Sequence, residues 1–153
     1  MISSIRLNNE LKKINTGGYE SMFKVSIVNE NIFDWIIEIN GPHSTLYAGY
    51  KFAISVKIGK NYPSDPPSVK CITKIKHLNI NEFGDICLDI LKTDGWSSTK
   101  TIVSIATSII SLLADPNPDD PLDSDLCHIY RSSPEVYRDI IIESCNSNAE
   151  KLD

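Results

Sequence analysis

Four short segments between residues 23 and 73 alternate apolar and polar side chains, and this alternation restricts the possible fold more than any other feature. The clearest segment, residues 50–58, is apolar at every second position from Phe52 to Ile58, which is typical of a strand with one buried face. The other three segments are residues 23–27, 33–39 and 68–73. Because the links between them are short, with residues 29–31 suited to a hairpin, they predict a four-stranded antiparallel meander.

Outside these segments the apolar residues recur with a helical period. Residues 3–14 place Leu7, Leu11 and Ile14 on one face, which predicts an N-terminal helix. A longer stripe predicts a central helix that packs on the sheet, and its members are Ile102, Ile105, Ala106, Ile109, Leu112 and Leu113.

The ends of the helices are marked by capping residues. We expect Ser98 or Thr99 to cap the central helix, and Asp115-Pro116 to end it. Two further helices are expected near residues 122–131 and 134–147, with Ser133 as the N-cap of the last. The sequence therefore predicts an α+β fold: an N-terminal helix, a four-stranded antiparallel meander sheet, a central helix packed on it, and two C-terminal helices.

The bulk properties of the chain exclude several classes of protein. Its 153 residues predict a single domain over 1–153, and a net charge of −5 argues against a nucleic-acid binder. No apolar run is long enough for a membrane span, and the first residues lack a secretory signal. The four cysteines show no paired zinc spacing, so we expect free thiols in the cytoplasm or nucleus and neither a metal nor a bound cofactor.

One cysteine, Cys87, lies in an irregular stretch, residues 77–97, rather than in a predicted helix or strand. A lone cysteine between aliphatic residues is usually a buried structural thiol. Here, however, Asn79, Asp89 and Asp120 supply polar groups that could converge on it. Because no histidine in a protease-like context accompanies Cys87, and a nearby carboxylate raises a thiol pKa, this thiol suits exchange with an activated thioester.

Release of an acyl group from Cys87 to an amine would need two further groups. A side-chain amide such as Asn79 could stabilise the tetrahedral oxyanion, an interaction of about 2.7–4 kcal/mol. Asp120 or Asp89 could orient the incoming lysine ammonium or accept its proton. The alternative is that Asn79 and Asp120 are turn residues without a chemical role.

The whole chain resembles the ubiquitin-conjugating enzymes, which carry ubiquitin from an activating enzyme to its target. The resemblance is carried by Gly41-Pro42, Tyr62-Pro63-x-x-Pro66-Pro67, His77-x-Asn79, Gly84-x-Ile86-Cys87-Leu88-Asp89-Ile90-Leu91, Trp96-Ser97 and Asp115-Pro116-Asn117-Pro118-Asp119-Asp120-Pro121-Leu122. It implies the same α+β fold, and it implies a cis peptide bond at Tyr62-Pro63.

The resemblance also implies a role for each site residue. Cys87 is expected to form the thioester, Asn79 to stabilise the oxyanion or the active-site loop, Asp120 to position or deprotonate the lysine, and Asp89 to help position it. His77, Leu78 and Trp96 are expected to be structural. The first helix, including Arg6, resembles the surface that meets the activating enzyme, although a solvated helix face is the alternative for Arg6, Lys12 and Lys13.

The implied partners are ubiquitin or a ubiquitin-like protein, an activating enzyme, a RING or HECT ligase, and lysines of protein substrates, with no nucleic acid and no membrane. ATP is used by the activating enzyme and not by this chain. Ubiquitin is the expected modifier; another ubiquitin-like modifier, or a non-catalytic ubiquitin-binding variant of the fold, are the alternatives.

The chain departs from the family pattern at several positions. Leu78 replaces a proline and predicts a looser loop around Asn79, and one extra residue separates Leu91 from Trp96. Ser64 and Ser98 stand where many members have an aromatic residue and a proline, which removes an apolar anchor for a ligase.

Overall fold

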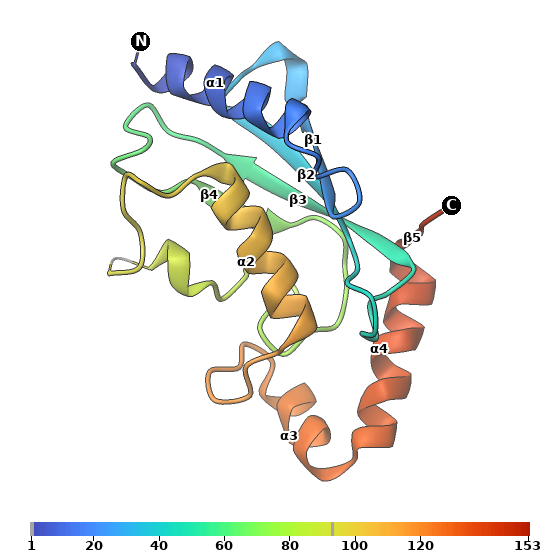
Figure 1. The fold of residues 1–153 in the computed structure, drawn as a ribbon. Coiled ribbons are helices and arrows are strands. Elements are labelled where there is room, and N and C mark those ends of the chain that lie inside the picture. Colours follow the sequence, from blue (N-terminus) through green and yellow to red (C-terminus); the bar gives the residue numbers. More distant parts are fainter. Residues whose placement is uncertain (1, 93) are drawn as a thin grey trace.

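The computed structural model describes residues 2–92 and 94–153 (Figure 1). In chain order its elements are α1 (Ile2–Thr16), β1 (Phe23–Ile27), the 3-10 turn η1 (Val28–Glu30), β2 (Asp34–Asn40), β3 (Tyr50–Lys57), β4 (Ser68–Cys71), the 3-10 turn η2 (Asp89–Leu91), α2 (Ile102–Ala114), α3 (Ser124–Ser132), α4 (Pro134–Asn148) and β5 (Glu150–Lys151). The predicted α+β fold is confirmed.

The sheet follows the order β1-β2-β3-β4, and every neighbouring pair is antiparallel. The register aligns buried side chains across the strands, for example Trp35 with Val56 and Ile37 with Ile54. One short strand was not predicted: β5 pairs with the first residues of β3. Both residues of β5 are charged and exposed, so no alternation of apolar residues marks it in the sequence.

Helix α2 crosses the sheet, as Figure 1 shows, and five of the six residues of the predicted apolar stripe are buried. The sixth, Leu112, is partly buried. The expected cap at Ser98 or Thr99 is wrong, because Thr101 is the N-cap. The Thr101 hydroxyl accepts from the Ser104 N–H at 3.2 Å, and the Ser104 hydroxyl accepts from the Thr101 N–H at 3.0 Å. This reciprocal pair satisfies two amide groups that the helix itself leaves free. Asp115 ends α2, as predicted.

Helix α1 is joined to the start of α2 by a buried carboxylate. Glu10 accepts hydrogen bonds from the Ile102 N–H at 2.8 Å and from the Tyr62 hydroxyl at 2.6 Å. Arg6 turns toward the same junction, where its guanidinium donates to the carbonyls of Ser98 and Lys100, each at 2.7 Å. The solvated alternative is therefore wrong for Arg6, since its side chain anchors the segment that leads into α2. It holds for Lys12 and Lys13, which are exposed.

The C-terminal helices extend from the end of α2 along one side of the molecule (Figure 1). Ser133 occupies the predicted N-cap position of α4 with Pro134 next to it, although the Ser133 side chain makes no capping hydrogen bond. The Tyr62-Pro63 peptide bond is cis, as predicted. Among the described residues, no helix is both long and apolar enough to cross a membrane.

Candidate active site

Cys87 is presented by a small bridged hairpin rather than by an unstructured loop. Ile80 pairs with Ile86, and the Cys87 N–H donates to the Asn79 carbonyl at 2.9 Å. The turn is closed by the Asn81 side chain, whose oxygen accepts from the Phe83 and Asp85 N–H groups. Gly84 is required at the turn, because its φ is +85° and a Cβ there would lie 2.4 Å from the Cys71 carbonyl oxygen.

Asn79 lies behind the thiol with 1% of its surface exposed. Its side-chain NH₂ donates to the carbonyls of Asn117 at 2.9 Å and Asp120 at 3.1 Å, while its oxygen accepts from the Asn117 N–H at 2.9 Å. Both amide hydrogens are therefore used to hold the loop between α2 and α3, residues 115–123.

His77 supports Asn79 from the core. Its Nδ1 accepts from the Asn79 N–H at 3.0 Å, and its Nε2 lies 2.9 Å from the Leu112 carbonyl oxygen, which fixes the tautomer that carries hydrogen on Nε2. Burial lowers the pKa of His77 to about 4. With both nitrogens bound to backbone groups, this imidazole is not free to act as a base.

Leu78 takes the place of the family's proline without displacing Asn79. Its side chain is fully buried in the core, and its carbonyl accepts from the N–H groups of Leu122 at 2.8 Å and Asp123 at 3.2 Å. The Leu78 carbonyl thus binds the C-terminal end of residues 115–123, while the Asn79 side chain binds Asn117 and Asp120 in the same loop.

The Cys87 thiol faces a carboxylate from that loop. Its Sγ lies 3.4 Å from Asp120 Oδ2, although the two residues are 33 positions apart. The pKa of Cys87 is raised, first by burial of the thiol and then by the hydrogen bond to Asp120. The same hydrogen bond, together with Lys92, lowers the pKa of Asp120, so this carboxylate is ionised at neutral pH.

Lys92 is a residue of this site that the sequence did not reveal. Its Nζ lies 3.1 Å from Asp89 Oδ1 and 3.3 Å from Asp120 Oδ2. These contacts raise the pKa of Lys92, the bond to Asp89 being the larger cause. Asp89 lies three residues before Lys92 in the chain. This spacing allows an ion pair and is the one feature of the sequence that could have indicated Lys92 as a residue of the site.

The other three cysteines are buried, free thiols. Burial raises the pKa of Cys71 to about 12 and that of Cys145 to about 11. Cys127 is also buried, and its Sγ lies 3.4 Å from the Pro118 carbonyl oxygen. Cys87 alone among the four is partly exposed, so it is the thiol that a large reactant can reach.

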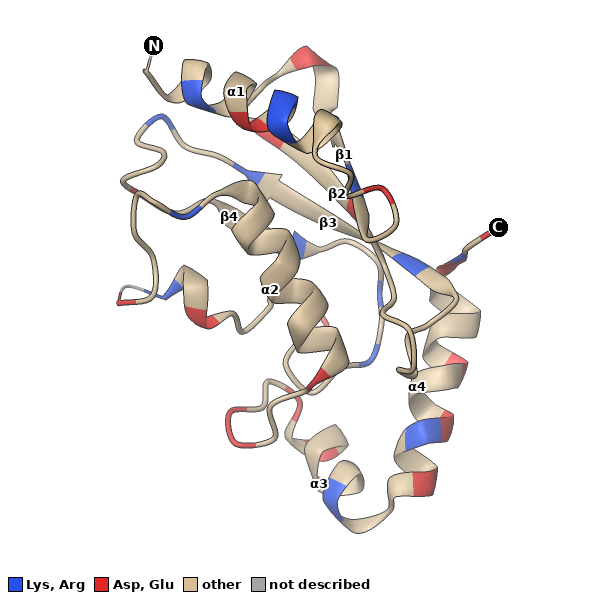
Figure 2. Ribbon diagram, in the orientation of Figure 1, with Lys and Arg blue, Asp and Glu red and all other residues tan. Residues whose placement is uncertain are grey.

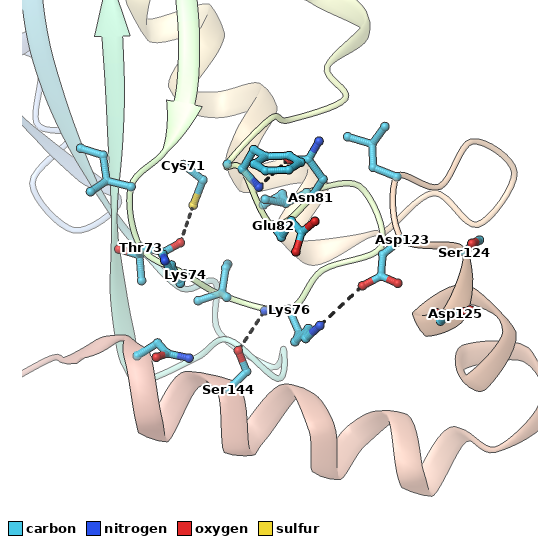
Figure 3. A pocket seen from close by; sticks show the side chains of 17 residues that line it. Cys71, Thr73, Lys74, Lys76, Asn81, Glu82, Asp123, Ser124, Asp125 and Ser144 are labelled. Carbon is cyan, nitrogen blue, oxygen red and sulfur yellow. Dashed lines mark hydrogen bonds and ion pairs between the residues drawn. The ribbon is translucent and has the colours of Figure 1, made fainter.

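Cys87 lines neither of two pockets found among the described residues. The pocket in Figure 3 is lined by residues of the β4–Cys87 connection, the start of α3 and one face of α4, with Lys76, Asp123 and Ser144 around it. The second pocket lies between the loop that joins β2 to β3, the end of α2, and helices α3 and α4. Within residues 2–92 and 94–153 no cluster of His, Cys, Asp or Glu is arranged to hold a metal ion. The partly exposed Cys87 thiol thus lies outside both of these pockets.

Trp96 anchors the segment that follows this site. Its indole N–H donates to the Pro63 carbonyl at 2.8 Å, and its ring lies 6.1 Å from that of Tyr62. These contacts tie Trp96 to the cis-proline turn. The structure thus places Trp96 in a supporting position beside the site.

Comparison with known proteins identifies the family of this chain. The sequence model of the family described as ubiquitin-conjugating enzyme matches residues 6–145. A probable ubiquitin-conjugating enzyme of Acanthamoeba polyphaga mimivirus is 43% identical over 147 residues, which are 95% of this chain and 93% of the relative.

Two solved structures share the fold. One, a putative ubiquitin-conjugating enzyme from Plasmodium yoelii, has a TM-score of 0.91 at 35% identity, covering 98% of this chain and 97% of the other. The other, a ubiquitin-conjugating enzyme domain from Toxoplasma gondii, has a TM-score of 0.88 at 35% identity, covering 95% and 98%. With its fold and nearly its full length matched, this chain belongs to the ubiquitin-conjugating enzymes, which are acyltransferases that act through a cysteine thioester.

Proposed function

We propose that this chain accepts ubiquitin from an activating enzyme as a thioester on Cys87 and transfers it to a lysine amine, with a ligase as the usual third partner. The observation that carries the proposal is the partly exposed Cys87 thiol, 3.4 Å from the Asp120 carboxylate and without a free imidazole beside it. Such a thiol is a modest nucleophile. It needs an acyl donor that is already activated, and a thioester is one.

Loading exchanges one thioester for another. The Cys87 thiolate attacks the carbonyl carbon of the activating enzyme's thioester, a new C–S bond forms, and the activating enzyme's cysteine leaves as a thiolate. Because the two C–S bonds are equivalent in kind, this step needs no strong base. The open position of Cys87 allows another protein to reach it.

Discharge is the step in which Asp120 has a chemical role. The acceptor lysine, whose pKa is about 10.4, arrives as an ammonium and must lose a proton before it attacks. We assign Asp120, which is ionised and close to Sγ, to orienting that ammonium. Because its lowered pKa makes it a weak base, proton loss from the lysine also requires desolvation of the ammonium or direct acceptance of the proton by Asp120. The amine then forms the C–N bond and loses its second proton to water or to the departing sulfur, and the C–S bond breaks to release Cys87.

We assign Asn79 to the positioning of Asp120. Both hydrogens of its amide are bound to carbonyls of residues 117 and 120, so neither is directed at an oxyanion in this structure. Of the two roles expected from the resemblance, stabilisation of the loop is the one that these hydrogen bonds support.

Ubiquitin is proposed as the modifier because the family and the relatives above are named for it. Another ubiquitin-like protein would use the same chemistry, so the test below also includes such modifiers. A non-catalytic variant of the fold would not need a partly exposed cysteine at position 87, so the presence of Cys87 argues against that alternative. Four free thiols suit a reducing compartment, so we propose that the enzyme acts in the cytoplasm or nucleus.

The test is thioester formation. The chain is incubated with ATP, a modifier and the matching activating enzyme, then run on a gel with and without reductant. We expect one ubiquitin adduct that reductant removes, that Cys87→Ala abolishes, and that Cys87→Ser converts to an ester cleaved by hydroxide. Cys127→Ser is the matched control, since a hydroxyl can keep the contact with the Pro118 carbonyl and loading should be unchanged. An adduct that forms only with a different modifier would identify that protein, and not ubiquitin, as the modifier carried. The absence of an adduct with any modifier would refute the carrier function.

A further inference from the structure

Lys92 occupies the position that an acceptor lysine would need. Its ammonium lies 3.3 Å from Asp120 Oδ2, and this same oxygen is the one that faces Cys87 Sγ at 3.4 Å. Its second contact, 3.1 Å to Asp89 Oδ1, keeps it at the site. A primary ammonium of this chain is therefore already bound to the carboxylate to which we assign the substrate's ammonium.

The backbone of Lys92 is fixed on both sides. Its N–H donates to the Asp89 carbonyl at 3.1 Å, and its own carbonyl accepts from the N–H groups of Gly95 at 2.9 Å and Trp96 at 3.1 Å. Its side chain is half exposed, so only the flexible methylene stem has to move for the ammonium to leave Asp120.

The charge of Lys92 has opposite consequences for the two half-reactions. Before loading, the thiol must ionise beside Asp89 and Asp120, whose charges oppose a thiolate, and a cation in contact with both carboxylates offsets them. During discharge the same cation competes with the incoming ammonium for Asp120. Figure 2 shows further acidic positions along the loop between α2 and α3.

We propose that Lys92 is an internal counter-ion that speeds loading of Cys87 and slows discharge, because its ammonium must leave Asp120 before an acceptor lysine can bind there. This inference rests on the proposed carrier function. Lys92 is a positioning residue, since it neither forms nor breaks a bond. The transferred proton goes from the acceptor ammonium to Asp120 or to water, and Lys92 keeps its own.

The expected size of the effect follows from the exposure of the pair. An exposed ion pair contributes little free energy, so occupancy of Asp120 by Lys92 should raise the apparent half-saturating concentration of acceptor by about two- to sixfold. A purely structural role would instead change both half-reactions in the same direction, together with thermal stability.

The experiment measures both half-reactions in single turnover. Loading is followed with activating enzyme, ATP and fluorescent ubiquitin; discharge is followed after removal of ATP, over a series of free lysine concentrations. Lys92→Gln removes the charge, and Lys92→Arg keeps it. Lys57→Gln is the matched control, because it also breaks one exposed pair, with Asp34 in the sheet, at 2.8 Å.

For Lys92→Gln we expect slower loading at neutral pH, by about two- to sixfold, and a half-saturating lysine concentration that is lower by a similar factor, with an unchanged plateau rate. Lys92→Arg and Lys57→Gln should behave as the wild type does. Changes of the same sign in both steps, or no change in either, would overturn the proposal for Lys92 while leaving the carrier function intact. If the wild type forms no thioester at all, the carrier function itself fails.

Discussion

The two sides of Cys87 are built from different interactions. Behind the thiol lies a buried frame, residues 77–79, whose polar atoms bind neutral backbone groups. In front of it lies a charged face, made of Asp89, Lys92 and Asp120, whose side chains are at least half exposed and are held by ion pairs.

Because of this difference, the frame fixes where the reacting groups lie, whereas the face can rearrange when a substrate binds. A buried group that loses its hydrogen bond costs about 1–3 kcal/mol, whereas an exposed ion pair contributes only about 0.2–1 kcal/mol. The frame can therefore fix where Cys87 and Asp120 lie. The face can rearrange when a substrate ammonium arrives, because its contacts are weak enough to exchange within one catalytic cycle.

The largest expected effect is on the stability supplied by the frame. Leu78→Ala removes a fully buried side chain and should lower the free energy of unfolding by about 2–5 kcal/mol, measured by urea denaturation. The contrasting change on the face, Asp89→Asn, should stay within about 0.5 kcal/mol of the wild type. Equal losses for the two variants would remove the distinction between frame and face.

A smaller effect should appear as a pH dependence of stability. Burial depresses the pKa of His77 to about 4 from an unfolded value near 6.5, so the unfolded state takes up this proton first. Stability from the neutral imidazole is complete above pH 6.5 and is lost as the pH falls toward 4, by about 3 kcal/mol in all. Urea titrations between pH 7 and 4 should show that this loss is smaller in His77→Gln than in the wild type. A change at the exposed His43 serves as the control, and a wild-type slope retained in His77→Gln would contradict this origin.

Much of the fold could be predicted because its signals are local. The alternation in residues 50–58 and the stripe on residues 102–113 each arise from neighbours along the chain. The cap at Thr101 was missed because Ser98 and Thr99 are equally good capping residues, and only the three-dimensional path of the chain selects among them. The short β5 was missed since two charged residues carry no apolar pattern.

The site was less predictable from the residues themselves. Asp120 approaches Cys87 across 33 positions, and the resemblance to a family, rather than any spacing rule, brought the two together. That the Asn79 amide is consumed by the loop requires the geometry of both segments. The sequence does not indicate Lys92, because a lysine near an aspartate is common on protein surfaces. Its second contact, with Asp120, joins residues far apart in the chain.

The most direct measurement is a double-mutant cycle between the frame and the face, read as the rate at which loaded ubiquitin passes to free lysine. Asn79→Ala alone should slow discharge by about tenfold or more while loading is retained, and Asp120→Ala should slow it by about 10² or more. If Asn79 acts by holding Asp120, adding Asn79→Ala to Asp120→Ala should cost less than about a further threefold. If the two factors multiply, Asn79 instead contacts the reacting group directly, and the division between a positioning frame and a reactive face is wrong.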